Sequence, residues 1–163
     1  MTKKELILNV EEYGSAAELN EADAALLQRA KDTTVDAYAP YSGFRVAAAA
    51  LLLNGEIVTG TNQENASFPA GICAKRVMLA SAATLFPGIA IDTLAISYHN
   101  HNANGHSDHP VSPCGICRQT LAEYQERVKH PIRLLLSGME GKVIAIEKAS
   151  DLLPLSFGGT DLK

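Results

Sequence analysis

The three cysteines of this 163-residue chain constrain its fold more than any other feature. Cys73 opens residues 73–76 (Cys-Ala-Lys-Arg), and Cys114 and Cys117 form a Cys-x-x-Cys within residues 113–119. No cysteine is left over. Each motif stands where the residue pattern predicts the start of a helix. If the three thiols act together, the fold must bring two helix N-termini, distant in sequence, to one point.

Three thiols at helix N-termini favour a metal site. A helix N-terminus carries about half a positive charge and free N–H groups, so a cysteine there ionises more easily. Three thiolates hold Zn²⁺ and leave a fourth position open for water, as in catalytic zinc sites. Arg76, at the end of the first motif, and Arg118, which directly follows Cys117, are expected to hydrogen-bond the sulfurs and offset the excess negative charge. A redox pair, a structural zinc with a histidine as fourth ligand, and buried cysteines without metal remain alternatives.

Composition indicates one globular domain. The chain is 47% hydrophobic and 20% charged, with a net charge of −4, which is typical of a protein with a single core. No Lys/Arg run is present, which disfavours nucleic acid as a partner. The longest apolar run, 46–53, is too short to span a membrane, and residues 1–5 lack the features of a signal peptide. Three cysteines cannot all pair as disulfides, so a cytoplasmic location is expected.

The hydrophobic pattern predicts an α/β fold over residues 1–163. Asn20 is expected to cap a helix that runs to about Tyr38, and Asn54-Gly55 predicts a hairpin. The further elements expected are strands at 44–53, 56–61, 92–98, 132–137 and 143–147, helices at 72–86 and 113–128, and a short last helix capped by Ser150. This order predicts a three-layer α/β/α arrangement around a mixed five-stranded sheet. Residues 1–19 form an N-terminal extension, in which 6–10 fit either a short strand or the start of a helix.

Residues 99–112 predict a polar surface loop. The loop is rich in histidine and contains a group of side chains that could bind a metal: His99, His101, His106, Asp108 and His109. A histidine-rich composition is weak evidence for a metal site. We therefore interpret the segment as a solvated loop.

Three further segments carry a resemblance to a known family. They are residues 38–46 (Tyr-Ala-Pro-Tyr-Ser-Gly-Phe-Arg-Val), 62–67 (Asn-Gln-Glu-Asn-Ala-Ser) and 152–157 (Leu-Leu-Pro-Leu-Ser-Phe). With the cysteine motifs, they cover about residues 20 to 160 in the family's order. The chain resembles the small cytidine deaminases of the zinc-dependent nucleoside deaminase superfamily. The resemblance implies a homotetrameric hydrolase that uses Zn²⁺ to convert cytidine or deoxycytidine to the uridine product in pyrimidine salvage.

The resemblance also implies roles for individual residues. The implied zinc ligands are Cys73, Cys114 and Cys117. Asn62 and Glu64 would hold ribose hydroxyls, and the backbone of Ala74 would donate to the base carbonyl. Phe44, and Phe157 of a neighbouring subunit, would pack around the pyrimidine. The alternative for the two phenylalanines is a place in the core, and for the two polar residues an ordinary place in a loop.

Two positions depart from the family's pattern: Ala47 replaces a glycine, and Lys75 replaces the catalytic glutamate. In zinc deaminases that glutamate moves the proton from water to the base, whereas an ammonium can only donate hydrogen bonds. Lys75 at the catalytic position therefore predicts impaired turnover. A neutral Lys75 would instead act as a weak base or occupy the open zinc position.

Three other functions are alternatives to cytidine deamination. The first is a pseudoenzyme that binds zinc and nucleoside, with Lys75 donating to the ring nitrogen of cytosine. The second is a deaminase of another aminopyrimidine nucleoside, which Asn62 and Glu64 disfavour because they suit a ribose. The third, a polynucleotide deaminase, has the least support because it needs a basic groove.

Overall fold

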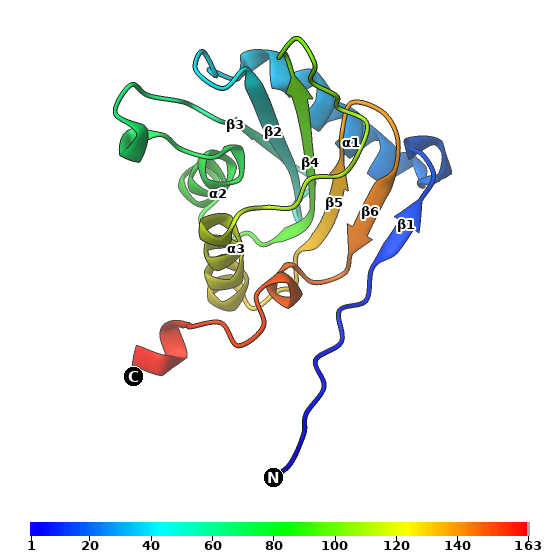
Figure 1. The fold of residues 1–163 in the computed structure, drawn as a ribbon. Coiled ribbons are helices and arrows are strands. Elements are labelled where there is room, and N and C mark those ends of the chain that lie inside the picture. Colours follow the sequence, from blue (N-terminus) through cyan, green and yellow to red (C-terminus); the bar gives the residue numbers. More distant parts are fainter. Residues whose placement is uncertain (163) are drawn as a thin grey trace.

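The computed structural model describes residues 1–162 and shows three layers, with α2 and α3 on one face of a central sheet and α1 on the other (Figure 1). The order of helices and strands is β1 (Glu11–Tyr13), α1 (Glu21–Thr33), β2 (Phe44–Leu52), β3 (Ile57–Thr61), α2 (Ala74–Leu85), β4 (Ile91–Asn100), α3 (Gly115–Val128), β5 (Arg133–Ser137) and β6 (Val143–Ile146). Short 3-10 turns are η1 (Ala16–Glu18), η2 (Thr34–Asp36), η3 (Phe68–Ala70), η4 (Ala149–Leu152) and η5 (Gly159–Leu162). The predicted α/β/α fold class is confirmed.

Over residues 1–162 the sheet is mixed, as predicted, but it has six strands rather than five. Its order is β1-β6-β5-β4-β2-β3, with β4 and β5 parallel. The additional strand is β1, in which Glu11 lies opposite Ala145 of β6. Three residues are too few to show the alternation by which a strand is recognised in a sequence. Residues 6–10, which fit either a strand or a helix, form neither and are exposed.

Helix α1 begins at its predicted cap and ends earlier than predicted. The Asn20 Oδ1 accepts a hydrogen bond from the Asp23 N–H at 2.9 Å. The hydroxyl of Thr33 donates to the Arg29 carbonyl, and that of Thr34 donates to the Lys31 carbonyl. Side chains that bond to the backbone in this way compete with regular helix, so α1 gives way to η2 instead of continuing to Tyr38.

Two other predicted element starts need correction. Helix α3 starts at Gly115, two residues after Pro113, with Cys114 as its N-cap residue. The short helix predicted to begin at Ser150 corresponds to η4, which has Lys148 at its N-cap position. Ser150 lies inside η4 and accepts a hydrogen bond from Gln125 Nε2 at 3.0 Å. The prediction of Ser150 as the cap is therefore wrong.

The strand pairing brings both cysteine motifs to one end of the sheet. Strand β2 pairs antiparallel with β3 and with β4, so β3 and β4 run in the same direction. Helix α2 follows β3, and α3 follows β4, so the N-termini of both helices lie beyond the carboxyl ends of these strands. Phe44, at the start of β2, is paired with Asn100 at this same end. Ligands of open α/β sheets bind at the carboxyl ends of strands.

Gly60 lets α2 approach β3 closely. A Cβ atom at Gly60 would lie 2.7 Å from the Ala74 carbonyl oxygen and would also collide with the Met78 nitrogen. Both obstacles are backbone atoms, which cannot move aside as a flexible side chain does. The absence of a side chain at Gly60 therefore determines where the first turn of α2 lies, and with it Cys73 and Lys75.

Replacing Gly60 should destabilise the fold. We expect Gly60→Ala to lower the free energy of unfolding by about 1–3 kcal/mol, because added volume in a packed contact forces the backbone to shift. Gly115→Ala is the matched control, since a Cβ there meets no atom within 4 Å and alanine favours helix over glycine. Urea and thermal unfolding would measure both. Equal stabilities of the two variants would show that the close contact at Gly60 does not matter.

Candidate active site

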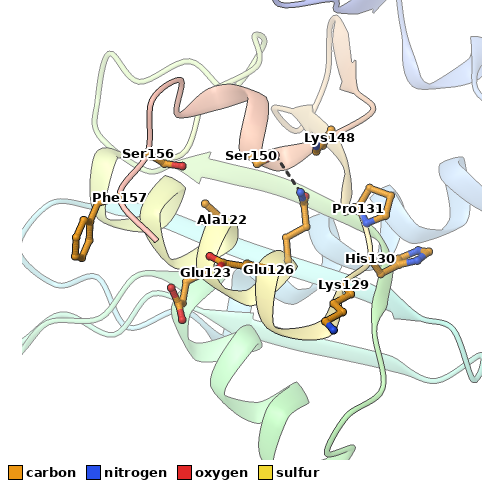
Figure 2. A pocket seen from close by; sticks show the side chains of 11 residues that line it. Ala122, Glu123, Glu126, Lys129, His130, Pro131, Lys148, Ser150, Ser156 and Phe157 are labelled. Carbon is orange, nitrogen blue, oxygen red and sulfur yellow. Dashed lines mark hydrogen bonds between the residues drawn. The ribbon is translucent and has the colours of Figure 1, made fainter. Parts of the chain in front are cut away.

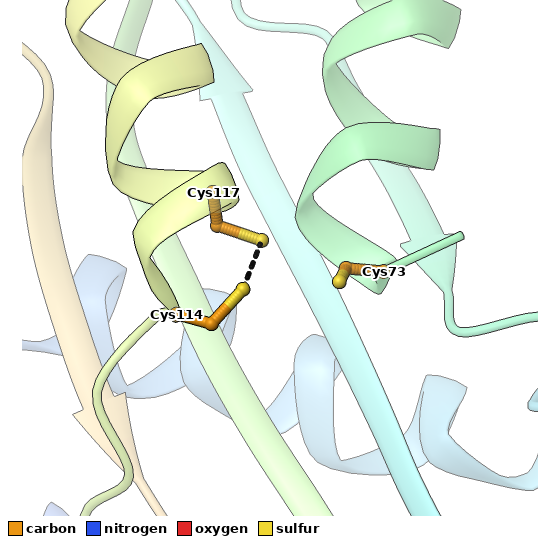
Figure 3. Close-up of side chains that lie close together, drawn as sticks. All are labelled: Cys73, Cys114 and Cys117. Atoms are coloured by element: carbon orange, nitrogen blue, oxygen red, sulfur yellow. Dashed lines mark hydrogen bonds between the residues drawn. The ribbon is translucent and has the colours of Figure 1, made fainter. Parts of the chain in front are cut away.

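Three cysteine side chains meet between the starts of α2 and α3 (Figure 3). Cys73 and Cys114 are the N-cap residues of the two helices, and Cys117 lies in the first turn of α3. The three sulfurs all lie within 4.8 Å of one another. In the described chain, no other group of three or more His, Cys, Asp or Glu side chains is placed to hold a metal ion. The histidines of residues 99–109 therefore form no such group.

The sulfurs fit a zinc ion in number, chemistry and spacing. Neither Cys73 nor Cys114 uses its side chain to cap its helix, so the sulfurs are available to a ligand. The Cys114 and Cys117 sulfurs are 3.7 Å apart. Two thiolates of a tetrahedral zinc site, each about 2.3 Å from the metal, are separated by about 3.8 Å.

The thiols differ in how readily they ionise. Cys117 is fully buried, and burial raises the pKa of its thiol to about 12, against the opposing influence of the Lys75 charge. Burial also acts to raise the pKa of Cys114, but hydrogen bonds from the backbone and thiol of Cys117 outweigh it and lower that pKa. Without a cation, Cys117 therefore keeps its proton at neutral pH.

Zinc binding should strengthen as the pH rises. Zinc takes thiolates as ligands, so Cys117 must release a proton on binding, and the apparent affinity should rise at least about tenfold per pH unit near neutrality. Competition with a chromophoric chelator at several pH values would measure this dependence. Cys117→Ser should lose tight binding. An affinity independent of pH in the native chain would contradict the participation of Cys117.

Lys75 lies buried at the start of α2, the helix whose N-cap residue is Cys73. It is the second residue of α2 and is 8% exposed. Among residues 1–162, no carboxylate forms an ion pair with it. Its positive charge acts to lower the pKa of Cys117, although burial outweighs this influence. A buried cation at a helix N-terminus is unfavourable unless an anion lies nearby.

The two arginines that follow the cysteines make other contacts. Arg118 donates from Nε to the Pro113 carbonyl at 2.8 Å and from Nη1 to the Leu152 carbonyl at 3.2 Å. Arg76 lines a separate groove of about 300 Å³ between α2 and α3. In the part of the chain that the structure describes, the hydrogen bond to a cysteine sulfur comes from another cysteine. The expected hydrogen bonds from Arg76 and Arg118 to the sulfurs are not present in this structure.

A cavity of about 440 Å³ adjoins the sulfur cluster through Cys73. Its lining residues are Tyr41, Ser42, Asn62, Gln63, Glu64, Asn65, Phe68, Gly71, Ile72 and Cys73. The cavity thus brings Asn62 and Glu64 together with one of the sulfurs. Its volume lies within the range of small-molecule sites, and a nucleoside is of suitable size.

Asn62 is held by the start of β2. Its Oδ1 accepts a hydrogen bond from the Val46 N–H at 2.7 Å, and its Nδ2 donates to the Phe44 carbonyl at 3.0 Å. The side chain therefore fixes the backbone that carries Phe44. One lone pair of Oδ1 and one N–H remain for a ligand.

Glu64 is an ionised carboxylate held by the preceding loop. Its Oε2 accepts hydrogen bonds from the N–H groups of Tyr41 (2.9 Å) and Ser42 (3.2 Å), and its Oε1 accepts one from the Ser42 hydroxyl. The Ser42 hydroxyl is the main cause that lowers the pKa of Glu64, although slight burial acts the other way. Each oxygen keeps acceptor capacity for a ligand hydroxyl.

An aromatic contact that the sequence analysis missed supports Phe44. Phe44 stacks on Tyr98, with ring centroids 4.7 Å apart and an interplanar angle of 16°. The Tyr98 hydroxyl lies 3.3 Å from the His109 ring, which bonds Asp108 at 3.0 Å. Tyr98 follows the buried Ile96 by two residues in β4, so the two side chains lie on the same face of the strand. This two-residue spacing was the signal in the sequence that could have identified Tyr98. Phe44 lies at this end of the sheet but does not line the cavity.

Phe157 lies apart from the sulfurs of its own chain. Its side chain is 60% exposed, and its carbonyl accepts a hydrogen bond from Gln119 of α3 at 2.8 Å. It lines a second cavity, of about 450 Å³, beside α3 together with Glu126 and Lys129 (Figure 2). One chain therefore brings together the sulfurs, Asn62 and Glu64, but not Phe157. Ala74 is fully buried as the first residue of α2.

Fold and site together define an α/β/α protein with a three-thiolate metal centre beside a polar cavity. Residues 20–130 match the family described as the cytidine and deoxycytidylate deaminase zinc-binding region, and the chain belongs to this family. Zn²⁺ is accordingly the cofactor that the family and the donor set define. The resemblance inferred from the motifs is confirmed.

Curated relatives and solved structures agree with this assignment. The cytidine deaminase of Halalkalibacterium halodurans is 34% identical over 137 residues, which cover 84% of this chain and 95% of the relative. That of Mycobacterium tuberculosis is 32% identical over 136 residues, covering 82% and 87%. The crystal structure of cytidine deaminase from Burkholderia pseudomallei matches with a TM-score of 0.70 at 35% identity, over 85% of this chain and 100% of that chain. Among residues 1–162, no helix has the length and apolar character needed to cross a membrane.

Proposed function

We propose that this chain binds cytidine or deoxycytidine beside its three-thiolate zinc centre and hydrolyses the amino group of the base, at a rate that Lys75 limits. The observation that carries the proposal is the meeting of three sulfurs at two helix starts, next to the cavity that holds Asn62 and Glu64. In the reaction, the oxygen of water bonds to the carbon that bears the amino group, the carbon–nitrogen bond breaks, and ammonia leaves. Zinc bound by the thiolates supplies the activation of water.

The residues around the centre orient the substrate. Glu64 is ionised and accepts a hydrogen bond from a ribose hydroxyl, while Asn62 contributes its remaining lone pair or N–H. The N–H of Ala74 is among the first of α2 and has no partner within the helix, so it can donate to the base carbonyl. Phe44, fixed by Tyr98 and Asn62, provides an apolar surface for the ring. These roles leave the proton transfer to Lys75.

Lys75 limits that proton transfer. The family's glutamate takes a proton from water and delivers it to the ring nitrogen. An ammonium has three N–H groups and no lone pair, so Lys75 can donate a hydrogen bond to the ring nitrogen but cannot collect the proton. Loss of positioned acid–base catalysis lowers a rate by about 10²–10⁴-fold.

The burial of Lys75 favours a second candidate function, nucleoside binding without turnover. An ammonium that is 8% exposed and lacks a carboxylate partner can donate to the unprotonated ring nitrogen of cytosine. Uracil carries a hydrogen on that nitrogen and offers no acceptor there. A chain with this function would bind cytidine, retain it, and prefer it to uridine.

Turnover by Lys75→Glu separates the two functions. We expect this variant to convert cytidine to uridine about 10²–10⁴-fold faster than the native chain, per bound zinc, because a carboxylate can carry the proton. Chromatography of the products would give the rates. Lys31→Met, which alters a buried lysine of α1 on the opposite face of the sheet, should leave the native rate unchanged. If the native chain is as fast as Lys75→Glu, Lys75 does not limit turnover. If zinc-loaded Lys75→Glu binds cytidine without converting it, the deaminase function is excluded.

Glu64→Gln tests the ribose contact. Replacing the carboxylate should weaken cytidine binding by about 10- to 100-fold, since hydrogen bonds to charged groups contribute about 1.5–3 kcal/mol. Isothermal titration with cytidine and with the free base cytosine would measure this. Affinity for cytosine and zinc content should stay constant, and Glu123→Gln, in the second cavity, serves as the control. Equal losses for cytidine and cytosine would assign Glu64 to the structure of the pocket instead of to the ribose.

We further propose free nucleosides rather than polynucleotides as substrates, and a homotetramer in which Phe157 of a neighbouring subunit completes the pocket. The net charge of −4 supports the first point. The second is supported by the exposure of Phe157 and by its place in a cavity other than the one that adjoins the sulfurs. Three reduced thiols also favour a reducing compartment such as the cytoplasm. Light scattering in solution tests the assembly, and a monomer with full affinity for cytidine would exclude it.

A further inference from the structure

We propose that the N-terminal segment, residues 3–11, pairs antiparallel with the same segment of a second copy of this chain. The segment runs into strand β1 and lies outside residues 20–130, which match the family. It also lies outside the metal centre and the two cavities described above. The inference therefore does not rest on the proposed function.

The N-terminal segment exposes a run of large apolar side chains. Leu6, Ile7, Leu8 and Val10 are each at least 45% exposed, and all of residues 1–10 are exposed. Figure 1 shows residues 1–10 as an extended trace that leaves β1 and runs away from the rest of the molecule. An exposed apolar surface of this kind is typical of a site that another protein covers.

Strand β1 adds a free sheet edge to this apolar run. It is the first strand in the sheet order, so β6 occupies only one of its two sides. The other side has no strand of residues 1–162 to bind its backbone N–H and C=O groups. Such an edge is a template for pairing with another chain, so a strand that continues from residue 3 into β1 can accept a strand from a second molecule.

The charges at the two ends of the segment make a second copy the fitting partner. Lys3 and Lys4 stand at one end, and Glu11 and Glu12 at the other, so antiparallel pairing brings basic and acidic ends together. Eight residues of extended chain span about 26 Å, which separates Lys3 from Glu11 of its own chain. Within residues 1–162, Lys3 and Lys4 form no ion pair, and Glu12 uses one oxygen to bind Lys142.

Two-fold symmetry limits the register of this pairing. A two-fold axis between antiparallel strands runs perpendicular to the sheet, so a residue and its copy lie on the same face. Directly opposed residues also share a face, and side chains alternate between faces along a strand. One residue must therefore oppose its own copy, and the possible registers differ only in which residue this is.

The charges favour the register in which Ile7 opposes its own copy. This register places Lys3 opposite Glu11 and Leu6 opposite Leu8. Pairs of opposite charge and apolar pairs both stabilise antiparallel strands. The two-fold axis forms each of these pairs twice.

The neighbouring registers fit less well. Centring the pairing on residue 8 would oppose Glu5 to Glu11, and like charges directly opposite are destabilising. Centring it on residue 6 would oppose both lysines to uncharged residues, Lys3 to Asn9 and Lys4 to residue 8. The pattern of charges therefore distinguishes one register from its neighbours.

Single cysteines test the pairing on the full-length, zinc-loaded chain. We expect Ile7→Cys to form a disulfide-linked dimer under mild oxidation, because the Cα atoms of opposed residues lie about 4.5–5.5 Å apart, within reach of a disulfide. Leu6→Cys is the matched control, since Leu6 and its copy lie diagonally, about 7–8 Å apart, which is too far for a disulfide. Mixing Leu6→Cys with Leu8→Cys should restore the cross-link. Non-reducing electrophoresis, with the native chain as baseline, would measure the dimer.

Charge reversal tests the same register by a second route. Lys3→Glu and Glu11→Lys should each weaken self-association by about tenfold, because like charges are then opposed. The double variant should regain native association. Glu5→Gln, which opposes the uncharged Asn9, should not weaken it. Analytical ultracentrifugation over a range of concentrations would give the association constants.

A chain that begins at residue 11 separates this inference from the proposed tetramer. It lacks only exposed residues, so it should keep its zinc and its assembly through Phe157 but have a lower mass in solution than the native chain. Equal masses of the two chains would overturn the inference, even if both are tetramers. Equal cross-linking of Ile7→Cys and Leu6→Cys would overturn it as well. A monomeric truncated chain beside a dimeric native chain would support N-terminal pairing and exclude the tetramer.

Discussion

The antiparallel pairing of β2 with strands on both sides is the constraint on which the site depends. It makes β3 and β4 run in the same direction, so the helices that follow them start at the same end of the sheet. The close backbone contact between Gly60 of β3 and α2 then fixes where α2 begins relative to the sheet. Two N-termini that meet in this way stabilise anions, and three cysteines placed there need no further structural element to form a metal centre. The metal chemistry thus follows from strand order.

The same end of the sheet also holds the surroundings of the cavity in place. Asn62 forms hydrogen bonds with the backbone of β2 on both sides of Arg45. Glu64 accepts hydrogen bonds from two backbone N–H groups of the loop that precedes β2. Tyr98 stacks on the ring of Phe44 from the neighbouring strand. These contacts order the pocket before any ligand arrives, and such preorganisation reduces the entropy lost on binding. Asn62, which is predicted to contact the ribose, therefore also holds the backbone that carries Phe44.

Local signals in the sequence sufficed for most of the fold and for the metal ligands. Asn20 marked the start of α1 because a cap acts within three residues, and the cysteine motifs stood out by residue type and spacing. Other features depend on partners that are distant in sequence. Strand β1 forms because its residues pair with the edge strand β6. Arg118 donates to the carbonyl of Leu152 and not to a sulfur. Helix α1 ends early because two threonine hydroxyls donate to backbone carbonyls. The hydrophobic pattern does not indicate which acceptors these hydroxyls bind.

The residue at position 75 must serve two requirements of the metal centre that oppose each other. A carboxylate there can carry a proton but adds negative charge next to three thiolates, so other cations must then neutralise the site. An ammonium adds a positive charge instead but cannot accept the proton. In this chain Arg118, which directly follows Cys117, donates to the backbone carbonyls of Pro113 and Leu152. A glutamate at position 75 therefore supplies a proton carrier and at the same time adds a negative charge at the helix start that Cys73 occupies.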